Sequence, residues 1–133
     1  MRRFKVFSGY QQFYVADVGL DPKAPEVWTD EHIAQRHHTQ RHITALCPAG
    51  DISARIISCG LGENVPEESN KSDFEIRTHI EVLSGKIGIF GWPWELQDQY
   101  EVAPGMYDIV FKGYQTDRVE EKEDFYVVKI EKA

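Results

Sequence analysis

Apolar and polar residues alternate along many stretches of this chain, and this period of two is the feature that most constrains its fold. The clearest example is 74–82, where an apolar face alternates with the polar residues Glu75, Arg77, His79 and Glu81. Successive side chains of a strand point to opposite faces, so the pattern predicts a strand with one side in the core. Comparable runs occur around residues 4–6, at 10–17, 40–47, 52–59, 106–112 and 125–131, and after residues 84–85. The sequence therefore predicts an all-β fold of about eight strands.

Short connections between these runs suggest how the strands are arranged. Ser8-Gly9, the segment 48–51 and Ser84-Gly85 are turn-forming, and each separates two apolar runs. Such short links usually join antiparallel neighbours in a hairpin. No internal repeat or linker divides the 133 residues. We therefore expect one domain, 1–133, folded as a single antiparallel β-sandwich with jelly-roll or Greek-key connections.

One short helix is predicted after a proline-containing loop. Pro22 and Pro25 lack backbone donors and fix φ, which favours an irregular segment there. The following stretch, 28–33, has Thr29 in a position to cap a helix. Asp30 and Glu31 would complement the positive end of its dipole.

The balance of charge bears on the partner. The formal net charge is -7 and the pI is about 5.2. Nucleic-acid phosphates reward a basic surface, so direct binding to nucleic acid is not expected. A basic protein partner is favoured instead, because acidic groups concentrate in expected loops at 67–68, at Glu95, Asp98 and Glu101, and at 120–124.

Cysteine usage and the apolar runs bear on the compartment. Cys47 and Cys59 each lie beside strand-like apolar sequence, which favours buried free thiols over a secreted disulfide framework. No run has the length or apolar character of a signal peptide or a membrane span. We therefore expect a cytoplasmic protein that does not associate with membranes.

Catalytic, metal and cofactor sites find little support in the sequence. His32, His37, His38 and His42 cluster, but a change from helix to strand is expected between them and no matching cysteine or carboxylate completes a metal signature. Stretches 79–87 and 104–107 have the rhythm of a cupin-like jelly roll, but a metal cupin needs a His-any-His pair, and His79 lies on the outward face. The chain is therefore expected to be no enzyme and to use no cofactor, with a cupin-like metal enzyme kept as an alternative.

Aromatic residues form the other notable group. The tripeptide Trp92-Pro93-Trp94, together with Trp28 and Tyr100, could form an exposed patch that anchors a partner. It could equally plug one end of the sandwich. Both interpretations stay open at the level of sequence.

Three segments resemble a known family. They are Phe7-Ser8-Gly9-Tyr10-Gln11-Gln12-Phe13-Tyr14-Val15-Ala16-Asp17, Trp28-Thr29-Asp30-Glu31-His32 and Pro104-Gly105-Met106-Tyr107. Together with the length and acidity they resemble the competence protein J family, bacterial proteins described as inhibitors of a DNA-entry nuclease. The resemblance implies a stoichiometric inhibitor of a nuclease, with no binding residue carried over from the family.

The residues favour a surface that binds another macromolecule. In this hypothesis, acidic loops face the cationic groove of a basic nuclease, and aromatic side chains anchor the contact. The partner-binding residues are predicted to be Trp28, Asp30, Glu31, Trp92, Trp94, Asp98 and Glu101. A small-ligand-binding β-sandwich is the main alternative.

Overall fold

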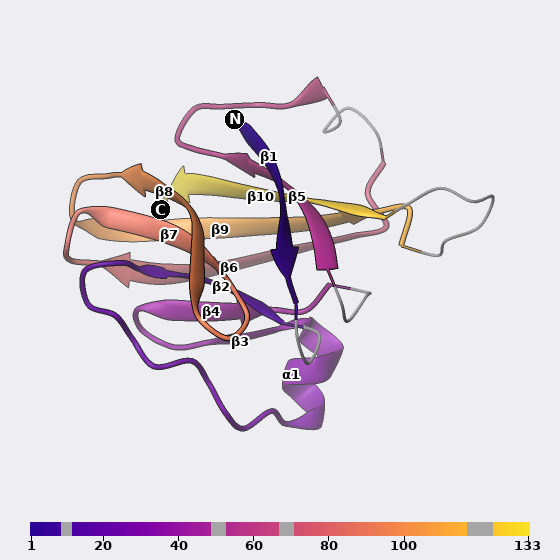
Figure 1. Cartoon of the computed structure of the whole chain (residues 1–133), viewed down its shortest axis with the longest axis horizontal. Helices are drawn as coiled ribbons and strands as arrows, with labels where there is room; N and C mark the ends of the chain where they lie inside the picture. Colours follow the sequence, from indigo (N-terminus) through magenta and orange to yellow (C-terminus); the bar gives the residue numbers. More distant parts are fainter. Residues whose placement is uncertain (9–11, 49–52, 67–70, 117–123) are drawn as a thin grey trace.

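The fold is built from two five-stranded β-sheets and one short helix (Figure 1). The computed structural model describes residues 1–8, 12–48, 53–66, 71–116 and 124–133. The first sheet has the order β1 (Arg2–Phe7), β5 (Ser53–Cys59), β10 (Phe125–Lys132), β9 (Gly105–Tyr114) and β6 (Phe74–Val82). The second has the order β3 (His37–Thr39), β4 (Ile43–Leu46), β2 (Phe13–Asp17), β7 (Lys86–Gly91) and β8 (Glu95–Glu101).

The predicted mostly-β character and the short helix are confirmed, with two differences in detail. The described residues form ten strands instead of about eight. The additional strands, β3 and β8, are short or polar and lack the alternation that marks the others. The sheets are also not wholly antiparallel, since β10 runs parallel to β5 from Tyr126 opposite Ile56 to Lys129 opposite Cys59.

The three hairpins predicted at short connections are wrong. β1 and β2 lie in different sheets, and so do β4 and β5, and β6 and β7. Geometry permits this, because the chain from Val82 to Lys86 reaches about 13 Å when extended and packed sheets lie roughly 10 Å apart. A short link can therefore cross from one sheet to the other. The jelly-roll or Greek-key connectivity stays a prediction.

The two sheets pack face to face around a shared apolar core. Phe13 of the second sheet meets Phe111 of the first edge-to-face, with ring centroids 5.5 Å apart. Fully burying a large apolar side chain stabilises the fold by about 1.5–3 kcal/mol. Other buried members come from both sheets, among them Val15, Leu46, Ile87 and Ile89 from the second and Ile56, Ile80, Ile109, Tyr126 and Val128 from the first.

The outer face of the second sheet is apolar as well, and so is part of the outer face of the first. The outer face of the second sheet carries Tyr14, Ala16, Ile43, Ala45 and Phe90, and irregular segments cover it with Val18, Ala24, Trp28, Trp92 and Trp94. On the first sheet, Val65 and Phe125 pack with Ile57, Cys59, Tyr114 and Val127. Every residue of β2 is therefore buried.

Helix α1 (Asp30–Gln35) begins where the sequence predicts. Thr29 Oγ1 accepts a hydrogen bond from the His32 backbone N–H, and the Thr29 N–H donates to His32 Nδ1 in return. This reciprocal arrangement is a capping box with histidine in the usual Glu or Gln position. The helix buries none of its own residues, and no described helix has the length or apolar character for a membrane crossing.

A buried carboxylate fixes the crossing between β6 and β7. Asp17, at the end of β2, is 0% exposed. It accepts hydrogen bonds from the backbone N–H groups of Leu83 and Ser84, at 2.7 and 3.1 Å, and from the Ser84 hydroxyl. Burial alone would raise the pKa of Asp17, but the Ser84 hydroxyl and these backbone donors outweigh it and lower the pKa.

Replacing Asp17 with Asn should destabilise the fold by about 2 kcal/mol at pH 7, because an amide accepts fewer hydrogen bonds and carries no charge. The lowered pKa means that this contribution is present above the unfolded carboxyl pKa of about 3.9 and is lost as pH falls through the folded value. Urea unfolding of both proteins between pH 7 and pH 3 should show that the difference between their free energies of unfolding becomes smaller as the pH falls. The exposed Asp30→Asn serves as control, and equal stability of Asp17→Asn and wild type at pH 7 would contradict the assignment.

Candidate partner-binding groove

A groove on the outer face of the second sheet brings together two of the tryptophans predicted from sequence. It has a cavity volume of 620 Å³ and lies between Trp28 on one side and Trp92-Pro93 on the other. The remaining lining residues are Gln12, Tyr14, Lys23, Ala24, Pro25, Glu26, Ile33 and Cys47. Most of these were not predicted. The continuous apolar run Phe13-Tyr14-Val15-Ala16 was the available signal, since a strand buried on both faces needs a covering segment on its outer side.

Trp28 is positioned by two imidazole rings. Its indole meets His32 edge-to-face at 6.1 Å and His38 edge-to-face at 5.8 Å between ring centroids. The two imidazoles stack on one another at 3.8 Å with an interplanar angle of 13°. Because His32 belongs to α1 and His38 to β3, the three rings tie the helix to the edge of the second sheet.

The opposite wall is set by the segment between β7 and β8. The Trp92 backbone N–H donates to the Phe7 carbonyl at 2.7 Å, and the two rings meet edge-to-face at 5.7 Å. The Trp92–Pro93 peptide is cis. Trp94 instead packs down on the sheet, stacking on Phe90 at 4.0 Å. Trp92 is therefore the member of the pair that lines the groove.

Two residues that line the groove carry polar atoms whose hydrogen-bonding capacity is unused among the described residues. Gln12 Oε1 and Trp28 Nε1 are buried and have no hydrogen-bond partner among the described residues. Leaving such an atom unsatisfied costs about 1–3 kcal/mol. Burial raises the pKa of Tyr14 to about 12, and it raises the pKa of the Cys47 thiol despite the opposing effect of Arg36. Both groups are therefore neutral at physiological pH, and Cys47 is no activated nucleophile.

Acidic and apolar side chains surround the groove. Glu26 lines it, and Asp30 and Glu31 lie exposed in the first turn of α1, the helix that contributes Ile33 to the lining. Val27 and Ile33 are 74% and 60% exposed, large values for aliphatic side chains. An apolar surface with a carboxylate border is typical of a protein interaction site.

The other residues predicted to bind a partner lie elsewhere. Trp94 is half-buried beneath the groove, and its Nε1–H donates to Asp21 at 2.7 Å. Glu101 lies near the far end of β8, where it pairs in register with Lys86. The acidic residues 67–68 and 120–123 lie outside the described residues. The structure thus groups Trp28 and Trp92 at the groove, with Asp30 and Glu31 beside them on α1, and separates Asp98 and Glu101 from them.

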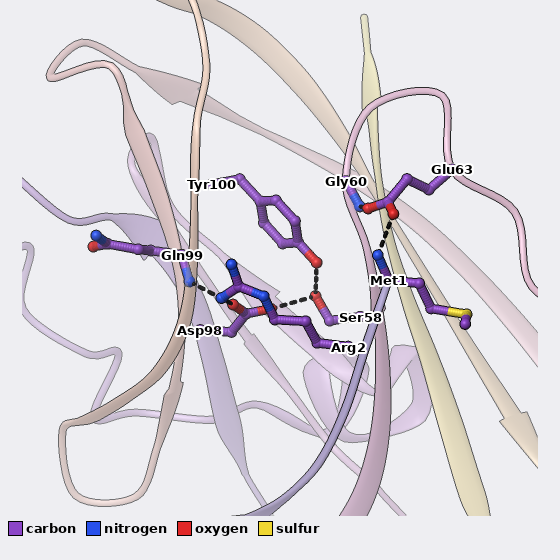
Figure 2. A network of polar contacts seen from close by, with 8 residues as sticks. All are labelled: Met1, Arg2, Ser58, Gly60, Glu63, Asp98, Gln99 and Tyr100. Atoms are coloured by element: carbon purple, nitrogen blue, oxygen red, sulfur yellow. Dashed lines mark hydrogen bonds and ion pairs between the residues drawn. The ribbon is translucent and has the colours of Figure 1, made fainter.

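Asp98 is part of a polar network that joins β1, β5 and β8 (Figure 2). Its side chain is fully enclosed and forms an ion pair with Arg2, whose side chain is 60% exposed. Ser58 donates to Asp98 at 3.0 Å and also lies 2.6 Å from the Tyr100 hydroxyl. The Asp98 carboxylate is already engaged inside the protein, and its contact with a partner stays a prediction.

The histidines do not form a metal site. Within the described residues, no group of three or more His, Cys, Asp or Glu side chains is placed to hold a metal ion. Because His32 and His38 stack face to face, their in-plane nitrogen lone pairs do not converge on one point. His79 is exposed on β6, on the outward face as the sequence predicts, so the cupin-like alternative gains no support.

Comparison with solved structures identifies the fold. The chain matches the crystal structure of ComJ from Bacillus subtilis, an inhibitor of the DNA degrading activity of NucA, with a TM-score of 0.78 and 18% sequence identity over 100% of this chain and 96% of that one. It also matches a protein described as crocagin biosynthetic gene J, with a TM-score of 0.52 and 10% identity over 99% of each chain. No protein-family model and no curated protein sequence matches. The resemblance to competence protein J is therefore confirmed as a shared fold.

The structural role of Asp98 predicts a difference between two arginine substitutions. Arg2→Ala should lower the free energy of unfolding by about 1–2 kcal/mol, because it leaves an enclosed carboxylate without its cation. Arg41→Ala is the matched control, since Arg41 is 73% exposed and its ion pair with Glu81 is a surface pair. That control should lose less than about 1 kcal/mol. Equal losses in urea unfolding would contradict the role given to Asp98.

Proposed function

We propose that this chain is a macromolecule-binding protein that inhibits a nuclease by stoichiometric contact, using the groove between Trp28 and Trp92. The observation that carries the proposal is the groove itself: tryptophan walls, exposed Val27 and Ile33, and carboxylates beside them. The fold adds support, because it is shared with ComJ, an inhibitor of the DNA degrading activity of NucA. The cytoplasm is the proposed compartment.

In the proposed mechanism, the acidic and the aromatic side chains have different roles. Glu26, Asp30 and Glu31 attract a cationic substrate groove, which on a nuclease is shaped to receive phosphates. Trp28 and Trp92 then bury apolar area and exclude water from the contact, as interface hot spots do. Binding blocks access of DNA and requires no chemical step on the inhibitor.

Small-ligand binding in the same groove is a second candidate function, favoured by one specific observation. Gln12 Oε1 offers an acceptor and Trp28 Nε1 a donor, neither of them used within the described residues. The cavity volume of 620 Å³ falls within the range of ligand pockets, about 300–1,000 Å³. A ligand with both an acceptor and a donor, such as an amide, would satisfy both atoms.

Truncating the groove walls should weaken inhibition. Trp28→Ala and Trp92→Ala should each raise the concentration for half-inhibition by about 30-fold, which corresponds to the loss of about 2 kcal/mol at an interface hot spot. The measurement is plasmid degradation by purified NucA, and by any nuclease encoded beside this chain, titrated with each variant. Leu83→Ala is the apolar control, because Leu83 is 49% exposed but lies at the β6–β7 crossing.

Neutralising the carboxylates beside the groove tests the electrostatic contribution to binding separately from that of the tryptophans. The triple variant Glu26→Gln, Asp30→Asn, Glu31→Gln should associate more slowly, and its affinity should depend less on salt than that of wild type. Glu75→Gln, which removes an exposed carboxylate from β6, should behave like wild type. Absence of inhibition by the wild-type chain at micromolar concentration and low salt would reject the proposed function.

A further inference from the structure

The wall of the groove is held by two titratable side chains. His32 and His38 stack at 3.8 Å, and both present a ring to the Trp28 indole, which meets each of them edge-to-face. Two neutral imidazoles stack favourably, whereas two imidazolium ions at this separation repel one another strongly. The position of Trp28 is therefore coupled to the protonation of the pair.

The capping box requires a neutral His32. Its Nδ1 accepts the Thr29 backbone N–H at 3.1 Å, which needs a lone pair on that nitrogen. A protonated imidazole has an N–H at both positions and can accept nothing. Protonation of His32 therefore removes half of the capping box, at the residue that directly follows Trp28.

His38 resists protonation in this setting. Burial lowers the pKa of His38, and the neighbouring His32 lowers it further, while a hydrogen bond with the Val27 backbone acts in the opposite direction. His38 Nδ1 is buried and has no partner within the described residues. Burial likewise lowers the pKa of His37, with added effects of His32 and His38.

The charged groups on the surrounding elements are of both signs. On α1, Asp30 and Glu31 are exposed, and Glu31 accepts from Gln35 at 2.9 Å. Glu26 and Lys23 lie on the covering segment and carry opposite charges, and β4 contributes no charged residue. Arg36, at the end of α1, lies over the Phe74 ring at 4.4 Å and adds positive charge.

From this geometry we infer that His32 and His38 form a pH-sensitive latch for the groove. While both rings are neutral, the latch holds Trp28 in the groove wall. When they take up protons, the stack and the capping box separate and Trp28 is released. The inference rests on the proposed function for its consequence, which is weaker partner binding at acidic pH.

The direction of the effect agrees with the lowered pKa of His38. The stacked state is fully favoured above the pKa of an unperturbed histidine, about 6.5, and loses stability as pH falls below it. If partner binding requires the neutral latch, uptake of one proton raises the apparent dissociation constant by up to about tenfold for each pH unit below the latch pKa.

The latch can be observed in the protein alone. In ¹⁵N–¹H spectra recorded from pH 7.5 to pH 5.0, the Trp28 indole N–H signal should shift and exchange faster with water as the pH falls. The Trp94 indole N–H, which is bonded to Asp21, is the internal reference and should stay in place. A Trp28 signal that does not respond over this range would overturn the latch.

Matched variants separate the latch from a general effect of pH. His32→Gln keeps a capping-box acceptor and His38→Phe keeps an aromatic ring, while each removes a titrating group. Either substitution should abolish or strongly reduce the response of Trp28. His79→Gln, on exposed β6, should leave it unchanged. A wild-type response in His32→Gln or His38→Phe would also overturn the proposal.

Inhibition assays then connect the latch to function. The wild-type chain should inhibit the nuclease up to about tenfold less well at pH 5.5 than at pH 7.5, whereas the double variant His32→Gln, His38→Phe should show a smaller change measured with the same nuclease. An equal change in both would overturn the regulatory consequence. Absence of inhibition at both pH values would reject the proposed function, and the indole spectra would still decide on the latch.

Discussion

Burial of the second sheet on both faces is the constraint on which this structure depends. Its inner face packs against the first sheet. Its outer face carries Tyr14, Ala16, Ile43, Ala45 and Phe90, and exposing these apolar side chains to water would be unfavourable. An irregular segment and three tryptophans provide that cover. Trp94 packs closely, but Trp28 and Trp92 leave a groove between them. The candidate site is thus an incompletely filled part of a hydrophobic layer.

Parts of the edge strands β1, β8 and β6 make contacts within the chain itself. Where β1 approaches β8, Arg2 reaches Asp98 and the Trp92 N–H bonds to the Phe7 carbonyl. Across the molecule, the Glu81 N–H bonds to the Arg41 carbonyl and their side chains form an ion pair. Exposed strand edges invite pairing with other chains, and charged, bonded edges discourage it. The outer face of the second sheet is therefore favoured over an edge as the interaction surface.

The alternation of residues predicted the principal strands well, because it reports directly on which faces are buried. It could not predict how they pair, because Ser84-Gly85 suits a hairpin as well as a crossing between sheets, and the deciding contact is made by the distant Asp17. The capped helix was predictable from Thr29 and the acidic residues after it. Of the residues predicted to bind a partner, Trp28 and Trp92 line one groove, whereas Asp98 is enclosed by a pairing with Arg2 that sequence could not reveal, because the two residues are far apart in the chain.

Hydrogen–deuterium exchange of this chain, free and bound to a nuclease that it inhibits, tests most directly whether the groove is the contact surface. The account predicts that binding slows exchange in the covering segment 23–33 and at 91–94, which form the two walls, and leaves β6 unchanged. Slower exchange confined to β6, or to the region around Glu101, would contradict it.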